Sequence, residues 1–200
     1  MNRLKYMTYL ACAIEQNTDD PTAHTWKDNI KELGNERFGI YDPIEQESKK
    51  TGKSFKEACD YLQGIKRGGH YEEFDFLMDE IWWGNVKPKI GNKISLLQYF
   101  KNTASIKGNF LEDFGKYGDY EAVCRSDFII VYLQKNVKTV GTLFEVHTAY
   151  LLDIPIYLII SDQTKTEANS TLLRAIRASK GEIFYNVQDC VKKLKEIYKF

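Results

Sequence analysis

A glutamate placed shortly after a glycine and a threonine marks the most chemically suggestive stretch of the sequence, TVGTLFEVHTAY at 139–150. Glu145 follows Thr142 by three positions, the spacing of a helix capping box, in which the two side chains bond free amides of the first helical turn. The same carboxylate could act as a nucleophile, because the start of a helix favours its ionised form. Both uses require a helix that opens at Gly141-Thr142.

The run before this stretch predicts a buried strand that would place Glu145 at a ligand-binding edge. DFIIVYL, at 127–133, is nearly continuous in apolar and aromatic residues, as in strands covered on both faces. Ligands of open α/β sheets bind beyond the carboxyl ends of the strands. A carboxylate in the first turn of the following helix can therefore face a ligand crevice.

Four further runs are typical of strands, and helical patterns lie between them. These strands are expected at Tyr6–Ile14, Arg37–Pro43, Ile154–Ile160 and Glu182–Asn186. One helix should follow the N-cap candidate Asp20, with Pro21 at its first position, and another should follow the N-cap candidate Asn186. Their apolar stripes are expected to be Ala23, Trp26, Ile30 and Leu33, and Val187, Val191, Leu194 and Ile197.

Strands that alternate with helices predict one α/β domain over 1–200. The expected architecture is a Rossmann-like or flavodoxin-like three-layer sandwich, with a five-stranded and mainly parallel sheet. A helical insertion at about 48–116 should separate the second and third strands, because this connection is far longer than usual. Gly68-Gly69 and Lys87-Pro88 are expected to divide the insertion.

Aromatic residues are frequent in the insertion and include Trp82 and Trp83. They could form a lid over the site or an oligomer contact, or they could pack the insertion onto the sheet, and we favour packing. The basic cluster KPKIGNK at 87–93 could contact phosphates, and we favour a solvated loop.

Composition and charge exclude several classes of protein. Lysine plus arginine total 28 and aspartate plus glutamate total 28, so a nucleic-acid polymer or an anionic membrane is not an expected partner. No apolar run approaches the roughly 20 residues that span a bilayer, and a cleavable leader pattern is lacking, so a cytoplasmic protein is expected. The cysteines are scattered along the chain and should be free thiols: Cys12, Cys59, Cys124 and Cys190. No metal or organic cofactor is expected.

Four segments in chain order resemble the nucleoside 2-deoxyribosyltransferase family and its relatives that hydrolyse deoxynucleoside 5′-monophosphates. They are YLACAI, YDP, DYEAVCRSDFIIVYL and VGTLFEVHTAYLLDIPIYLII. The resemblance covers roughly 5–47 and 116–199 and leaves the insertion unexplained. It implies that Glu145 attacks the anomeric carbon of the sugar and forms a covalent glycosyl intermediate.

The same resemblance implies roles for three further residues. Asp119, eight positions before Asp127, would contact or protonate the nucleobase, while Asp127 would stabilise the fold. Tyr9, in YLAC, would hold the catalytic carboxylate through its hydroxyl. The substrate-binding candidates are Cys12, Asp42, Thr139, Gly141 and Thr142.

Two positions depart from the family pattern. Thr139 stands where the transferases usually carry an aspartate, six residues before the nucleophile, which favours a nucleotide or an unusual base as substrate. Cys12 replaces a glycine of the first strand and narrows the space where the sugar should approach the backbone.

The predicted function is cleavage of a nucleoside or nucleotide N-glycosidic bond, with transfer of the sugar to another base or to water. Two carboxyl groups suit this chemistry, because one can attack the sugar while the other donates a proton to the leaving base. The family also implies a homo-oligomer. The alternative is a non-catalytic nucleotide-binding sensor or regulatory module on the same fold.

Other interpretations are weaker. GTLFE also resembles a motif of the cytokinin-activating phosphoribohydrolases, but the double glycine that precedes it there is missing. Cys12 as a nucleophile has no histidine near it in sequence. His147 follows Glu145 by two and should turn away from the same helix face, and His24 and His70 carry no partner signal.

Overall fold

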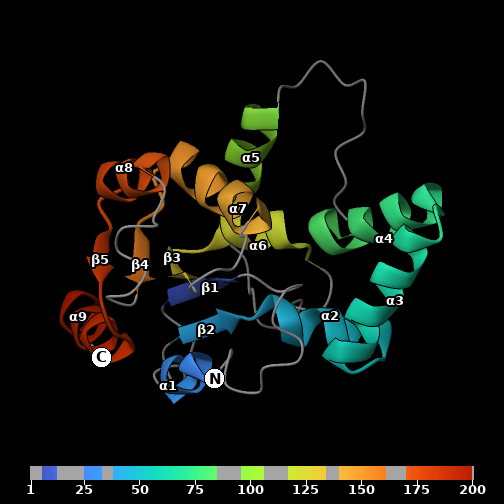
Figure 1. Ribbon diagram of the computed structural model, residues 1–200. Coiled ribbons are helices and arrows are strands. Elements are labelled where there is room, and N and C mark those ends of the chain that lie inside the picture. The colour runs from blue at the N-terminus through green and yellow to red at the C-terminus, as the bar shows by residue number, and fades with distance from the viewer. Residues whose placement is uncertain are drawn as a thin grey trace, which may run out of the picture.

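Five parallel strands form the centre of the protein (Figure 1). The computed structural model describes residues 6–12, 25–32, 38–84, 96–105, 117–133, 140–160 and 170–199. The strands are β1 (Tyr6–Cys12), β2 (Phe38–Tyr41), β3 (Phe128–Leu133), β4 (Ile156–Ile160) and β5 (Glu182–Phe184), in the order β2-β1-β3-β4-β5. This order is that of flavodoxin-like doubly wound sheets, so the predicted fold class is confirmed. All four strand pairings are parallel.

Three predicted strand ends were wrong by two residues each. β2 ends at Tyr41 rather than Pro43, because Asp42 caps the next helix and Pro43 occupies its first position. β4 begins only at Ile156, after Pro155, which has no amide proton for the ladder. β5 ends at Phe184, two residues before the helix cap Asn186.

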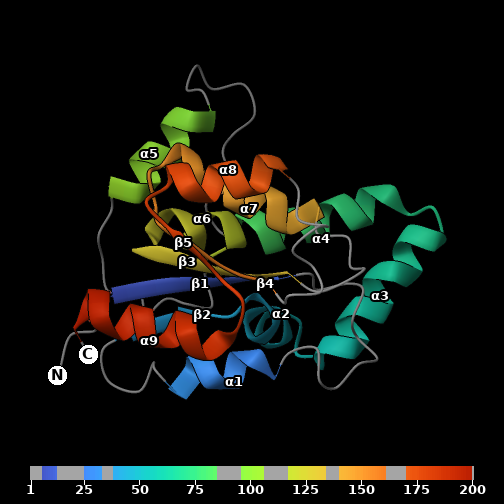
Figure 2. The same cartoon turned by 60° about the vertical axis from the view of Figure 1, so that its left-hand side comes forward.

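Helices cover both faces of the sheet, as Figure 2 shows. The helices α1 (Trp26–Lys31) and α9 (Val187–Tyr198) lie on one face, and α6 (Asp119–Arg125), α7 (Val140–Leu151) and α8 (Ser170–Ala178) lie on the other. The predicted cap of α9 is confirmed, because the Asn186 side chain accepts a hydrogen bond from the Asp189 amide. The predicted cap Asp20 lies outside the described residues.

Within the described parts of 42–118, four helices separate β2 from α6: α2 (Pro43–Thr51), α3 (Phe55–Arg67), α4 (Tyr71–Trp83) and α5 (Leu96–Ser105). In Figure 1, α2, α3 and α4 extend from the edge of the sheet toward which β2 points. Gly69 has a φ of 75° between α3 and α4, a left-handed conformation that glycine adopts without strain. Lys87-Pro88 lies outside the described residues, and no helix in the described ranges could span a membrane.

The aromatic residues of the insertion pack against α6. The Trp83 ring lies 4.8 Å from that of Tyr120 and 6.2 Å from that of Phe100, measured between centroids. Trp82 contacts the edge of Tyr120 and remains 37% exposed. These contacts join α4, α5 and α6, so the insertion packs against α6, one of the helices that cover the sheet.

The end of α4 also touches the chain just before α6. Gly84 forms an antiparallel bridge with Tyr117, and a Cβ added at Gly118 would lie 2.3 Å from the carbonyl oxygen of Trp82. The three atoms nearest to such a Cβ all belong to the backbone of Trp82 and Gly84, so no flexible side chain could move away to make room for it. The insertion therefore fixes the segment that leads directly into Asp119.

Replacing Gly118 with alanine tests this contact. We expect Gly118→Ala to lower the free energy of unfolding by at least about 2 kcal/mol, because the methyl group meets backbone rather than side chain. Gly64→Ala is the matched control, since no atom lies within 4 Å of a Cβ there and the change within α3 should stabilise by up to about 1 kcal/mol. Urea unfolding measures both, and equal stability of the two variants would contradict the close approach.

Candidate functional site

Glu145 of α7 is held by a hydrogen bond from the central part of the sheet. Tyr9 of β1 donates from its hydroxyl to Oε1 of Glu145 over 2.6 Å. Tyr9 is fully buried and Glu145 is 8% exposed. The second oxygen, Oε2, is buried and has no hydrogen-bond partner among the described residues. A buried carboxylate oxygen without a partner is costly, and such groups are often kept for function.

The structure does not form the predicted capping box. α7 begins at Val140, so Thr142 lies inside the helix and Glu145 lies beyond the first turn. The Thr142 hydroxyl is buried without a hydrogen-bond partner among the described residues, and Glu145 points to Tyr9 instead of back to the helix start. The capping interpretation was wrong because the helix opens two residues earlier than expected.

A second buried carboxyl group belongs to Asp119, which is the first residue of α6 and is 7% exposed. The hydroxyl of Tyr41 lies 3.4 Å from its Oδ1 and 3.0 Å from the carbonyl oxygen of Tyr117. Tyr9 and Tyr41 are register partners in β1 and β2, and their rings stack at 5.4 Å. Two stacked tyrosines on adjacent strands therefore reach one carboxyl group each.

Burial controls the protonation of both acids. It raises the pKa of Glu145 from 4.5 to about 8, with a further contribution from the charge of Asp119, while the Tyr9 hydrogen bond and Lys27 oppose the shift. Burial also raises the pKa of Asp119 from 3.8 to about 7, against the attraction of Lys50 and the hydrogen bond from Tyr41. The predicted preference of Glu145 for its ionised form is thus outweighed by burial. Near neutral pH the pair holds roughly one proton to share.

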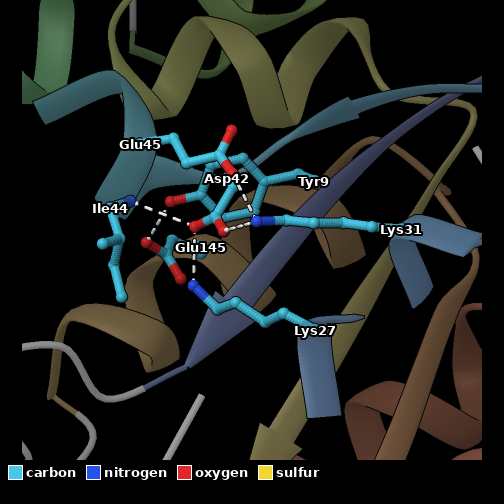
Figure 3. A network of polar contacts seen from close by, with 7 residues as sticks. All are labelled: Tyr9, Lys27, Lys31, Asp42, Ile44, Glu45 and Glu145. Atoms are coloured by element: carbon cyan, nitrogen blue, oxygen red, sulfur yellow. Dashed lines mark hydrogen bonds and ion pairs between the residues drawn. The ribbon is translucent and has the colours of Figure 1, made fainter. Parts of the chain in front are cut away.

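A network of charged side chains lies beside Tyr9 and Glu145 (Figure 3). Lys27 of α1 and Asp42 are 2% and 3% exposed and form an ion pair of 2.6 Å. Lys31 reaches the other oxygen of Asp42 at 3.3 Å and also contacts Glu45. Asp42, a predicted substrate-binding residue, also accepts from the Ile44 amide as the N-cap of α2. Both its oxygens are therefore engaged by the protein itself.

The remaining predicted positions differ in their surroundings. Cys12 is buried at the end of β1, and burial raises the pKa of its thiol to about 11, so the thiol is protonated at neutral pH and unsuited to act as a nucleophile. Gly141 and His147 are exposed on α7, and Thr139 lies outside the described residues. Asp127 accepts from the Met7 amide at 2.8 Å, which supports the structural role inferred for it.

The structure brings together Tyr9, Asp119 and Glu145 and adds Tyr41 and Lys27, which the sequence analysis did not single out as site residues. Tyr41 could have been found by aligning YDP with YLAC as neighbouring strands, since register then opposes it to Tyr9. Lys27 carried no signal, because a lysine in a helical stretch is usually solvated. Comparison with known protein families and with curated protein sequences finds no match.

The raised pKa of Glu145 predicts how stability changes with pH in a Glu145→Gln variant. The unfolded chain loses this proton near pH 4.5 while the folded chain keeps it up to about pH 8, so ionisation destabilises the wild type as pH rises through this window. Glutamine does not ionise and can still accept from Tyr9. We therefore expect the variant to gain on the order of 5 kcal/mol relative to wild type between pH 4 and pH 9.

Urea unfolding at the two pH values measures this gain. Glu72→Gln, an exposed change in α4, is the control and should alter stability equally little at both pH values. A Glu145→Gln effect that does not vary with pH would show that this carboxyl group ionises normally.

Proposed function

We propose that the protein is an enzyme that cleaves the N-glycosidic bond of a nucleoside or nucleotide and passes the sugar to another base or to water. The observation that carries the proposal is the buried acid pair, in which one oxygen of Glu145 is anchored by Tyr9 and the other has no hydrogen-bond partner within the part of the chain that the structure describes. The resemblance of four segments to nucleoside 2-deoxyribosyltransferases supports the same chemistry. That resemblance further suggests a cytoplasmic homo-oligomer.

Each acid has a distinct role in the proposed reaction. Oε2 of ionised Glu145 bonds to C1′ of the sugar as the bond from C1′ to the base nitrogen breaks. The proton on Asp119 passes to the leaving base, which takes the electron pair of the broken bond. Water or a second base then attacks C1′ and gives up a proton to Asp119, which restores the acid, while the bond from C1′ to Oε2 breaks and Glu145 leaves as a carboxylate.

Tyr9 and Lys27 support this division of roles. The hydrogen bond from Tyr9 stabilises the ionised form of Glu145 and fixes the direction of its second oxygen. The positive charge of Lys27 favours the same form, while its ion pair with Asp42 keeps it in place. Because the pKa of Asp119 is the lower of the two, the reactive form, with Glu145 ionised and the proton on Asp119, is the minor of the two singly protonated forms of the pair.

A substrate panel tests the proposal. We expect wild-type protein to release or exchange base from at least one 2′-deoxynucleoside or its 5′-monophosphate, assayed by chromatography with and without free adenine or cytosine. Glu145→Gln should lose several orders of magnitude in turnover while its folding and ligand binding remain. Binding without turnover by wild type across the panel would contradict the enzyme and favour the nucleotide-binding sensor.

The acid pair also predicts the pH dependence of the reaction. Because Glu145 must be ionised and Asp119 protonated, kcat/KM should be bell-shaped with its maximum between about pH 7 and pH 8. Asp119→Asn removes the neighbouring charge, so the acid limb should move to lower pH and the alkaline limb should disappear. A profile that is flat from pH 5 to pH 9 would contradict these assignments.

A further inference from the structure

A cavity of about 490 Å³ lies between α2, α3 and α4, outside the residues assigned so far. Its volume falls in the range of small-molecule sites. Apolar side chains of α3 and α4 form much of its wall: Ala58, Leu62, Leu77 and Ile81. Walls of this kind suit the faces of a flat ring, which gains by leaving water.

Lys50 connects the cavity to the acid pair. Its side chain lines the cavity, and its Nζ donates to the carbonyl oxygen of Tyr117 at 2.6 Å. Tyr117 is two residues before Asp119, and Gly84, which also lines the cavity, pairs with Tyr117. The inner end of the cavity therefore adjoins the segment that carries the proposed proton donor.

The charges near Lys50 indicate what the cavity can accept. Asp119, Glu47 and Glu80 all attract its ammonium group, and the charged residues that line the cavity are Lys50, Lys53 and Glu80, so its polar side carries charges of both signs. A neutral ring with donor and acceptor edges can pair with groups of both kinds. Glu80 supplies an acceptor at the polar side of the cavity, where the Thr51 hydroxyl is already bonded to the Glu47 carbonyl and the Lys53 amide.

We infer that this cavity binds the nucleobase of the proposed reaction, with the ring between α3 and α4 and the sugar directed toward Glu145. The inference rests on the proposed function. Nucleobases combine flat apolar faces with donor and acceptor edges, which matches both parts of the lining. Glu145 interacts with Asp119, Asp119 interacts with Lys50, and Lys50 lines the cavity. A sugar at Glu145, a leaving nitrogen at Asp119 and a base in the cavity would follow one another in the same order. The insertion would then select the base.

Methyl NMR tests the inference directly. Adenine and cytosine are titrated separately into wild-type protein with labelled leucine and isoleucine methyl groups. The base that binds should shift the signals of Leu62, Leu77 and Ile81 and leave Leu194, in the core on the α9 face, unchanged. Binding that shifts only methyl groups elsewhere, or no binding of either base, would overturn the inference.

Two variants separate this inference from the proposed function. Leu77→Trp fills the cavity and should weaken base binding by about tenfold or more, whereas Leu97→Trp, at a partly exposed position of α5, should not. Glu80→Gln removes an exposed charge without threatening the fold and should change the ratio of adenine to cytosine affinity. If wild type cleaves nucleosides while both cavity variants keep the affinities of wild type, the function stands and the base site lies elsewhere.

Discussion

The hydrogen bond between Tyr9 and Glu145 joins the sheet to the helix that carries the proposed nucleophile. It spans 136 positions in the chain, and it exists only because β1 and α7 pack closely within one core. The bond occupies one carboxylate oxygen, and the proposed substrate would contact the other. The proposed role of Glu145 depends on this single contact, since a freely rotating carboxylate would present no defined oxygen.

Burial of two carboxyl groups lowers the stability of the folded protein and raises the pKa of both acids toward neutral pH. An acid in an apolar environment keeps its proton, and the second acid nearby strengthens this tendency. A sugar that develops positive charge would reverse the balance for Glu145 as the bond breaks. The stacked tyrosines, Lys27 and Lys50 adjust each acid separately, and the packing of α4 against Gly118 keeps Asp119 in position.

The sequence predicts the architecture well because apolar strand runs and the Asn186 cap are local features. It fails at Pro43 and at Thr142, where a difference of two residues at an element boundary changes a strand end into a helix or a cap into an interior position. Tyr9, Asp119 and Glu145 were predicted through a family resemblance. Strand register brings Tyr41 to the site, and helix packing brings Lys27 and Lys50. Neither effect can be read from a local pattern in one sequence.

The central claim is that Glu145 forms a covalent bond to the sugar. A 2′-deoxy-2′-fluoroarabino nucleoside of the preferred base should trap this species, because the electronegative fluorine disfavours the positive charge that develops during its breakdown. Intact-mass spectrometry followed by peptide mapping measures the product. The account predicts a mass increase equal to the fluorinated sugar, located on Glu145. An adduct on another residue, or base release that leaves the protein mass unchanged, would contradict it.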